Sequence, residues 1–180
     1  QRYLVIPKTG SVRRVYYPVA FVDPVVIAST DLFTCVDATV FHFGVLASAM
    51  HTTWILAIAG RFKSDPRYSA GLVFNNFPWP EPDTKQRAAV EKAAQAVLDA
   101  RKPHIDGGGS LADLYDPLAM PAELVQAHAA LDRAVDAAYA YKGSKDDAAR
   151  VAFLFARYSE LAAPLDAAAQ AGKVTKPRRK

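Results

Sequence analysis

"ATVFHFGVLASAMHTTWILAIAG", residues 38–60, contains no Asp, Glu, Lys or Arg, and its apolar residues lie nearly all round a helix. A run of this length is long enough to cross a bilayer, which requires about 20 residues. The run contains His42, Ser48, His51, Thr52 and Thr53, which are more polar groups than a spanning helix normally holds. We therefore predict one long helix, capped by Asp37 and ended by Gly60, that is buried in a protein without a membrane partner.

The residues before this helix are typical of β-strands. Four short runs are rich in β-branched and aromatic residues: Arg2–Pro7, Val12–Phe21, Val25–Thr30 and Asp31–Val36. Pro18 indicates an edge position, or the end of strand pairing, in the second run. The first 80 residues thus predict a β-containing region built around one buried helix.

The residues after the helix predict a connector and then an all-helical domain. "PWPEPD" (Pro78–Asp83) is rigid, because three prolines and the residues before them disfavour helix, and we place the domain boundary there. Asp83 and Gln86 form a capping box, and further helices are expected from Pro121 and from the Ser144–Asp147 region, with Pro164 breaking or kinking the last. The predicted fold class is α+β, with a β-containing region at 1–80, a helical domain at 83–172 and a basic, disordered tail at 173–180.

Composition indicates a globular protein, with 51% hydrophobic and 22% charged residues among 180. The single cysteine, Cys35, forms no internal disulfide, and we expect a reducing, cytoplasmic setting. Because the first residue is Gln1 rather than methionine, we expect the chain to come from a longer protein. The net charge of +4 is unevenly spread, since residues 1–80 and the tail are basic and the middle is acidic.

No motif in the sequence predicts catalysis, a metal site or a cofactor site. The four histidines lack carboxylate or cysteine neighbours at metal-binding spacing, so we interpret them as structural. Gly107–Gly109 follow a helix and a proline, whereas a phosphate-binding loop follows a strand and opens a helix. The acidic residues of the helical part are expected on solvent-exposed faces, with no acid/base pair and no nucleophile elbow among them.

One charged segment is unusual, because Arg61, Lys63, Asp65 and Arg67 alternate with other residues. If the segment is extended, these side chains project to the same side. They are then either a solvated strand edge whose charges deter aggregation, or a surface that contacts nucleic acid. In the second case, Lys63 donates to guanine O6/N7 and Asp65 accepts from cytosine N4 of one G·C pair. The nearby cations are candidates for phosphate contacts, which fix register: Lys8, Arg13, Arg14 and Arg61.

Four segments, in the same order, resemble the MmeI-like restriction–modification enzymes and related DNA adenine methyltransferases. These are "RYLVIPKTGSVRRVYYPVAFVDP" (2–24), "FHFGVLASAMHTTWI" (41–55), "GRFKSDPRYSAGLVFNNFPWPEP" (60–82) and "LADLYDPLAMPAELVQAHAALDRAVDAAY" (111–139). The resemblance implies the C-terminal part of a target-recognition domain followed by the family's helical C-terminal domain. It also implies base reading at Lys63, Asp65 and Arg67. Pro66 stands where the family often carries Tyr, and the missing backbone donor predicts a gap in strand pairing.

The resemblance further implies an upstream core in the same longer chain. That core transfers a methyl group from S-adenosylmethionine to adenine N6, using an Asn-Pro-Pro-Tyr/Phe loop and a cofactor loop that this sequence lacks. The expected function of this part is therefore sequence-specific recognition of double-stranded DNA, without catalysis of its own. Two alternatives remain open, namely a protein–protein scaffold whose basic edge is incidental, and an enzyme with an unrecognised chemistry.

Overall fold

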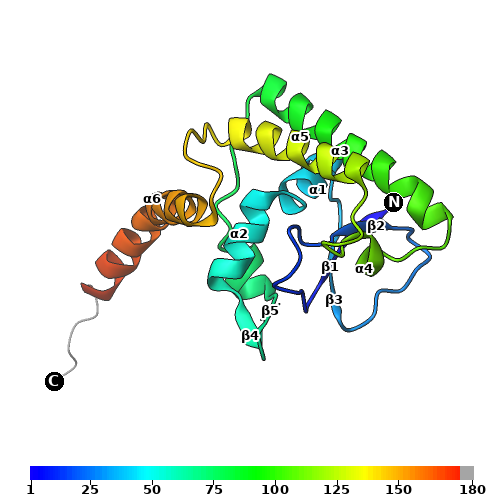
Figure 1. Ribbon diagram of the computed structural model, residues 1–180. Helices are drawn as coiled ribbons and strands as arrows, with labels where there is room; N and C mark the ends of the chain where they lie inside the picture. The colour runs from blue at the N-terminus through cyan, green and yellow to red at the C-terminus, as the bar shows by residue number, and fades with distance from the viewer. Residues whose placement is uncertain (175–180) are drawn as a thin grey trace.

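The computed structural model describes residues 1–174, and the side chains of its last helix as far as Pro164. The predicted α+β class is confirmed, with small sheets in the first third of the chain and mostly helices after it (Figure 1). The strands are β1 (Tyr3–Pro7), β2 (Ala20–Val22), β3 (Leu32–Cys35), β4 (Gly60–Phe62) and β5 (Asp65–Arg67). The helices are α1 (Val40–Leu46), α2 (Ala49–Ile58), the π-helix η1 (Ala70–Phe74), α3 (Thr84–Asp106), α4 (Leu111–Leu114), α5 (Ala122–Ala138) and α6 (Asp147–Val174).

The first sheet has the strand order β2-β1-β3, and both pairings are antiparallel. The central strand β1 is apolar and buries its middle three residues. The strand predicted for Val25–Thr30 is wrong, because a turn forms there instead. The carboxylate of Asp23 accepts a hydrogen bond from the Val25 N–H, and its carbonyl accepts one from the Val26 N–H. The run Val12–Phe21 is also mostly turns and irregular chain, and only its end joins β2.

The stretch 38–60 is buried as predicted, but it forms two helices rather than one. α1 and α2 are bent by 54° at Ala47–Ser48. The Ser48 hydroxyl donates to the carbonyl of Val45 at 2.7 Å, and the Ser48 side chain caps α2. Such a local side-chain bond competes with the helical ladder and explains the break. None of the described helices is by itself long and apolar enough to span a membrane, and α1 and α2 reach that length only together.

The cap of the first of these helices also differs from the prediction. Thr39, not Asp37, precedes α1, and its backbone N–H donates to Nδ1 of His42 at 3.0 Å. Asp37 lies in a left-handed conformation, with φ of 57°, in the preceding turn. His42 thus has a structural role, because its ring accepts a hydrogen bond from a backbone N–H group at the start of α1 that has no partner within the helix.

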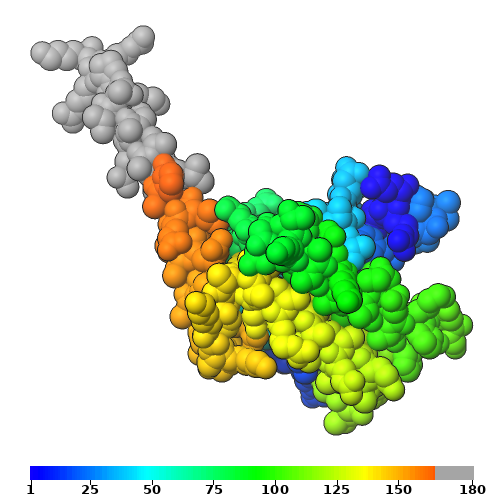
Figure 2. Space-filling model, turned by 90° about the horizontal axis from the view of Figure 1, so that it is seen from above, coloured from blue at the N-terminus to red at the C-terminus, as the bar shows by residue number. Residues whose placement is uncertain are grey.

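A single hydrophobic core joins the two predicted regions. α1 contacts α3 and reaches β2 through the rings of Phe43 and Phe21, while α2 contacts α6. α3 and α5 lie side by side along one face (Figure 2). Gly44 marks the closest approach, since a Cβ there would meet the Cβ of Ala94 at 2.9 Å and a methyl group of Val90 at 3.0 Å. Residues before and after the connector (Pro78–Asp83) therefore pack into the same hydrophobic core.

Aromatic residues at the start of the connector pack onto the core. Phe77 is buried against His51 and Trp54, and Trp79 contacts the rings of Phe74 and His42. The predicted capping box of Asp83 and Gln86 is present at the start of α3. The segment before the connector is the π-helix η1.

Neither Pro103 nor Pro164 ends the helix that contains it. α3 continues through Pro103 to Asp106, because a proline in the last turn removes only one ladder bond. α6 continues through Pro164 to Val174, so that proline does not break it. Of the tail predicted as disordered, residues 175–180 lie outside the described residues.

Candidate nucleic-acid interface

The alternating charges lie on a two-stranded hairpin, not on one extended strand. β4 and β5 pair antiparallel, with Gly60 opposite Arg67 and Phe62 opposite Asp65, so Lys63 and Ser64 form the turn. Lys63 has φ of 56°, in the left-handed region, and its side chain is exposed. The hairpin therefore places Lys63 at its tip, next to Asp65 on the returning strand.

Pro66 does not interrupt this hairpin, contrary to the prediction. It pairs opposite Arg61, and its carbonyl accepts a hydrogen bond from the backbone N–H of Gly10 at 3.0 Å. The proline ring is buried and no donor is required of residue 66. A proline is therefore compatible with this strand position.

Residues 8–12 dock along the open side of β5. The N–H of Tyr68 donates to the Lys8 carbonyl at 2.7 Å, and Thr9 forms an isolated bridge with Arg67. Farther along, the N–H of Val12 donates to Oδ1 of Asp65 at 3.3 Å. The two basic segments of the sequence, 8–14 and 61–67, are thus brought together on one surface.

The three base-reading candidates differ in how far the protein engages them. Among the described residues, Lys63 and Arg67 have no hydrogen-bond or ion-pair partner for their side chains, and both are exposed. Asp65 is half-buried, and only its Oδ1 has a partner. The hairpin therefore presents two donors and one carboxylate oxygen to solvent.

The four backbone-contact candidates lie around this hairpin. Arg61 donates to the carbonyl of Leu56 at 2.6 Å, and Arg14 donates to the carbonyl of Ala112 at 3.4 Å. Lys8 lies over the ring of Phe33, with its Nζ 5.0 Å from the centroid. Arg13 is exposed without a side-chain partner in the part of the chain described. Three of the four are thus tethered to the protein, and none of these tethers neutralises their charge.

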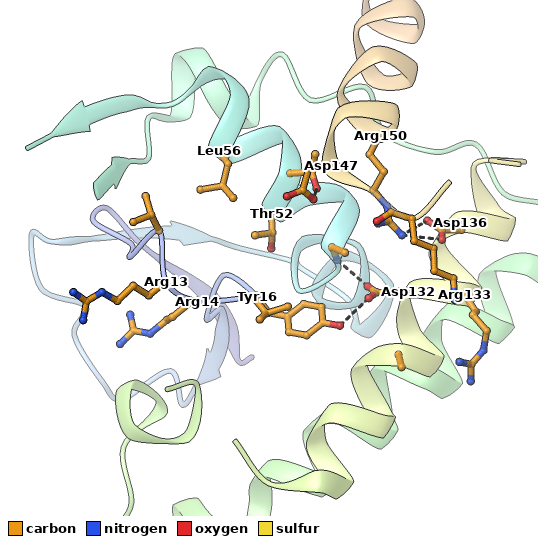
Figure 3. Close-up of a pocket in the computed structure, with 16 residues that line it drawn as sticks. Arg13, Arg14, Tyr16, Thr52, Leu56, Asp132, Arg133, Asp136, Asp147 and Arg150 are labelled. Carbon is orange, nitrogen blue, oxygen red and sulfur yellow. Dashed lines mark hydrogen bonds and ion pairs between the residues drawn. The ribbon is translucent and has the colours of Figure 1, made fainter. Parts of the chain in front are cut away.

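A cleft of about 450 Å³ adjoins the hairpin, and sequence reasoning missed it (Figure 3). It lies between residues 12–16, α2, α5 and the start of α6. At its floor, the Tyr16 hydroxyl donates to Oδ2 of Asp132 at 2.8 Å, and the N–H of Ala49 donates to Oδ1 at 2.8 Å. Burial raises the pKa of Asp132 and also the pKa of Tyr16.

This geometry corrects the expectation that the acidic residues of the helical part lie on solvent faces. The Asp132 carboxylate faces the first N–H group of α2, where the helix dipole favours a negative charge. No sequence signal predicts this contact, because the two elements are far apart along the chain.

Comparison with known proteins separates the chain into two matched regions. Residues 1–81 match the family described as "MmeI, target recognition domain", and residues 82–166 match the one described as "MmeI, C-terminal domain". The chain belongs to the MmeI family. The hairpin is thus part of an MmeI-type target recognition domain, and the cleft lies between that region and the C-terminal one.

Two relatives support this assignment. MmeI itself, a Type IIL restriction-modification enzyme whose structure was solved in complex with DNA, is 45% identical, with a TM-score of 0.87 over 91% of this chain and 22% of that one. DNA methyltransferase A of Bacillus subtilis (strain 168) is 40% identical over 158 residues, which are 88% of this chain and 18% of that protein. The chain therefore spans about a fifth of the length of each relative.

A buried polar network ties the two MmeI-type regions together. Arg101 of α3 donates to the carbonyl of Val19 at 2.7 Å and also to the hydroxyl of Tyr115. Since that hydroxyl accepts from Arg101, we infer that it donates to Nε2 of His128, 2.6 Å away. The ring of Tyr16 stacks on His128 with centroids 3.9 Å apart.

Three of the four histidines, His42, His51 and His128, have structural partners within the protein. Burial lowers the pKa of His128 to about 3 and that of His51 to about 4, so both are neutral near pH 7. His51 lies 3.0 Å from the carbonyl of Leu46 and 3.2 Å from the hydroxyl of Tyr68. Within the described residues, no three His, Cys, Asp or Glu side chains gather as a metal site would require.

Proposed function

We propose that this chain recognises a specific sequence of duplex DNA for a site-specific adenine-N6 methyltransferase that contains it. The observation that carries the proposal is the β4–β5 hairpin. It exposes Lys63 at its tip, beside Asp65, whose carboxylate has a hydrogen-bond partner on only one of its two oxygens among the described residues. The major groove admits a two-stranded β-ribbon of this kind. The MmeI relative was solved in complex with DNA, which supports the same partner here.

The chemistry of the hairpin suits one G·C pair. The Lys63 ammonium would donate to O6 and N7 of guanine, and the free oxygen of Asp65 would accept from N4 of cytosine. The bond from the Val12 N–H to the other oxygen holds the carboxylate in one orientation. Arg67, exposed on the same hairpin, would contact a neighbouring base.

The surrounding cations would hold the DNA backbone. Lys8, Arg13, Arg14 and Arg61 would contact phosphates, which position the duplex without reading sequence. The target adenine must leave the base stack to be methylated. Holding the flanking base pairs in register during that step is the role that we propose for this chain.

The reaction itself would belong to an upstream core of the same longer protein. S-adenosylmethionine bound there would supply the methyl group. This chain contributes no Asn-Pro-Pro-Tyr/Phe loop to that site, and its proposed domains remain a recognition region at 1–80 and a helical domain at 83–172. We propose a cytoplasmic location for the enzyme, in agreement with its unpaired Cys35.

The decisive experiment exchanges the two readers. In the full-length protein, K63D/D65K should change the preferred base pair at one G·C position of the methylated site, as mapped by sequencing modified DNA. K102D/D106K makes the same exchange at an exposed ion pair of α3 and should leave the site unchanged. An unaltered recognition sequence in K63D/D65K would refute base reading by this pair.

A further inference from the structure

The cleft beside the hairpin is lined by charged residues from both MmeI-type regions. Three are acidic and five are basic: Asp132, Asp136 and Asp147, and Arg13, Arg14, Arg133, Lys145 and Arg150. The formal excess of positive charge is small. Among these described residues, only Asp136 is paired with a cation, Arg150, so four cations and two unpaired carboxylates remain.

Each acidic residue is already engaged within the protein. Asp132 accepts from Tyr16 and from the first N–H of α2. Asp136 forms an ion pair with Arg150 at 3.0 Å, and both side chains are largely buried. Asp147 accepts from the Thr53 hydroxyl at 2.9 Å. Asp132 and Asp147 keep their charge, but they are held by donors within the protein, and among the described residues neither forms an ion pair with the remaining cations.

Four cations remain without an acidic partner among the described residues, and together they form what we call the rim: Arg13, Arg14, Arg133 and Lys145. Arg13 and Arg14 come from the target recognition region, whereas Arg133 lies on α5 and Lys145 precedes α6. Figure 3 shows Arg13 and Arg14 on one side of the cleft and Arg133 on the other, with their ends directed outward. The rim therefore suits a long anion lying across it better than a small one enclosed within it.

The rim is continuous with the hairpin. Val12 lines the cleft and also donates to Asp65, and Leu56 lines the cleft and also accepts from Arg61. A DNA strand whose bases face Lys63 and Asp65 would thus carry its neighbouring phosphates toward the rim.

We propose that the rim binds consecutive phosphates of the DNA backbone beside the base pair read by the hairpin, with Arg133 and Lys145 supplied by the C-terminal domain. This inference rests on the proposed function and assigns the C-terminal domain a direct share of the DNA contact. Phosphate contacts fix register and carry no sequence information. They also make affinity depend on salt, because each neutralised phosphate releases condensed counterions.

The test is the salt dependence of binding by the full-length protein. For R133Q/K145Q, the slope of log affinity against log salt should become shallower by about 2, since each phosphate contact contributes about 0.9 on B-DNA. The change should be the same on a duplex with the methylated site and on one without it, and the recognised sequence should not change. A wild-type slope, or an effect confined to one base pair, would overturn the proposal.

Two controls separate a backbone contact from other causes. K85Q/K92Q removes two exposed lysines of α3 that do not line the cleft, and should keep the wild-type slope. R133K/K145R retains both charges and should also keep the wild-type salt dependence. A shallower slope in that variant would contradict the proposal. If the wild-type protein shows no preference for its site, the proposed function fails, whereas a preference with unchanged variant slopes defeats only the rim.

Discussion

The hydroxyl of Tyr16 donates to Oδ2 of Asp132 across 2.8 Å, and this bond joins the target recognition region to the C-terminal region. The same carboxylate accepts from the first N–H of α2 through its other oxygen. Asp132 thus satisfies one group from the irregular 12–19 segment and one from a buried helix. The segment that carries Arg13 and Arg14 is held in place by this carboxylate.

Replacing Tyr16 by phenylalanine should lower the free energy of unfolding by about 2 kcal/mol, because hydrogen bonds to charged groups contribute more than neutral ones. Y17F is the matched control, since the Tyr17 hydroxyl donates to the uncharged carbonyl of Pro7 at 2.8 Å. Its cost should be about 1 kcal/mol. Urea unfolding of both variants measures the difference, and equal losses would show that the charge of Asp132 adds nothing.

Gly44 should tolerate alanine poorly, although alanine favours helix. The added methyl group would meet Ala94 at 2.9 Å, and overpacking of this kind costs about 1–3 kcal/mol, more than the roughly 1 kcal/mol gained in helix propensity. G71A introduces the same methyl group where no atom lies within 4 Å and should be neutral or stabilising. Thermal melting of the two variants should therefore shift in different directions, and a G44A protein as stable as wild type would contradict the close approach of α1 and α3.

The free energy of unfolding should fall as the pH is lowered, because His51 is buried in its neutral form. Burial lowers the pKa of His51 from 6.5 to about 4, so between these pH values the unfolded chain binds a proton that the folded chain excludes. The stability present above pH 6.5 is lost as the pH falls toward 4, by about 3 kcal/mol from this residue. H51Q should lose less stability than wild type between pH 7 and pH 4.5 in denaturant titrations.

The pH experiment needs a control for the change of residue type. H104Q makes the same substitution at an exposed position of α3. His128 also titrates far below its ordinary range, so H51Q should keep part of the pH dependence. An H51Q protein with the full wild-type dependence would show that His51 is not the group responsible.

The turn at Lys63 allows its side chain to be tested apart from its backbone. Because the residue has φ of 56°, K63G should be more stable than K63A by about 0.5–1 kcal/mol. Both variants lack the ammonium group, so both should lose discrimination at the same G·C position of the methylated site. If K63G kept that discrimination, the Lys63 ammonium would not be the reader.

The sequence predicts burial well in this chain and geometry less well. The absence of charge in 38–60 correctly predicts a buried helical segment, but the break at Ser48 depends on one hydroxyl that bonds to Val45. The hairpin at 60–67 lacks the Asn-Gly or Asp-Gly turn that would predict it, since Lys63 takes the left-handed position without being glycine. The sequence therefore predicts one extended segment for these charged residues, whereas the structure places them on a two-stranded hairpin.

The cleft was beyond sequence reasoning for a different reason. Tyr16 and Asp132 are 116 residues apart, and each belongs to a pattern with an ordinary explanation, an aromatic strand and a solvated helix face. They meet only in the folded chain, where the ring of Tyr16 stacks on His128 of α5 and the carboxylate of Asp132 bonds to the start of α2. Contacts of this kind depend on the tertiary arrangement, which no local periodicity encodes.

The shared interior of the two MmeI-type regions limits how members of the family can be recombined. A chimera joined at residues 81–82 would place the Gly44 side of the α1–α3 contact in one parent and the Ala94 side in the other. Such a hybrid inherits an interior that was never fitted together, even though the joint itself falls in a surface connector. New specificities should therefore be made by changing solvent-facing side chains of the hairpin. Where a whole domain is exchanged, both regions should be transferred together.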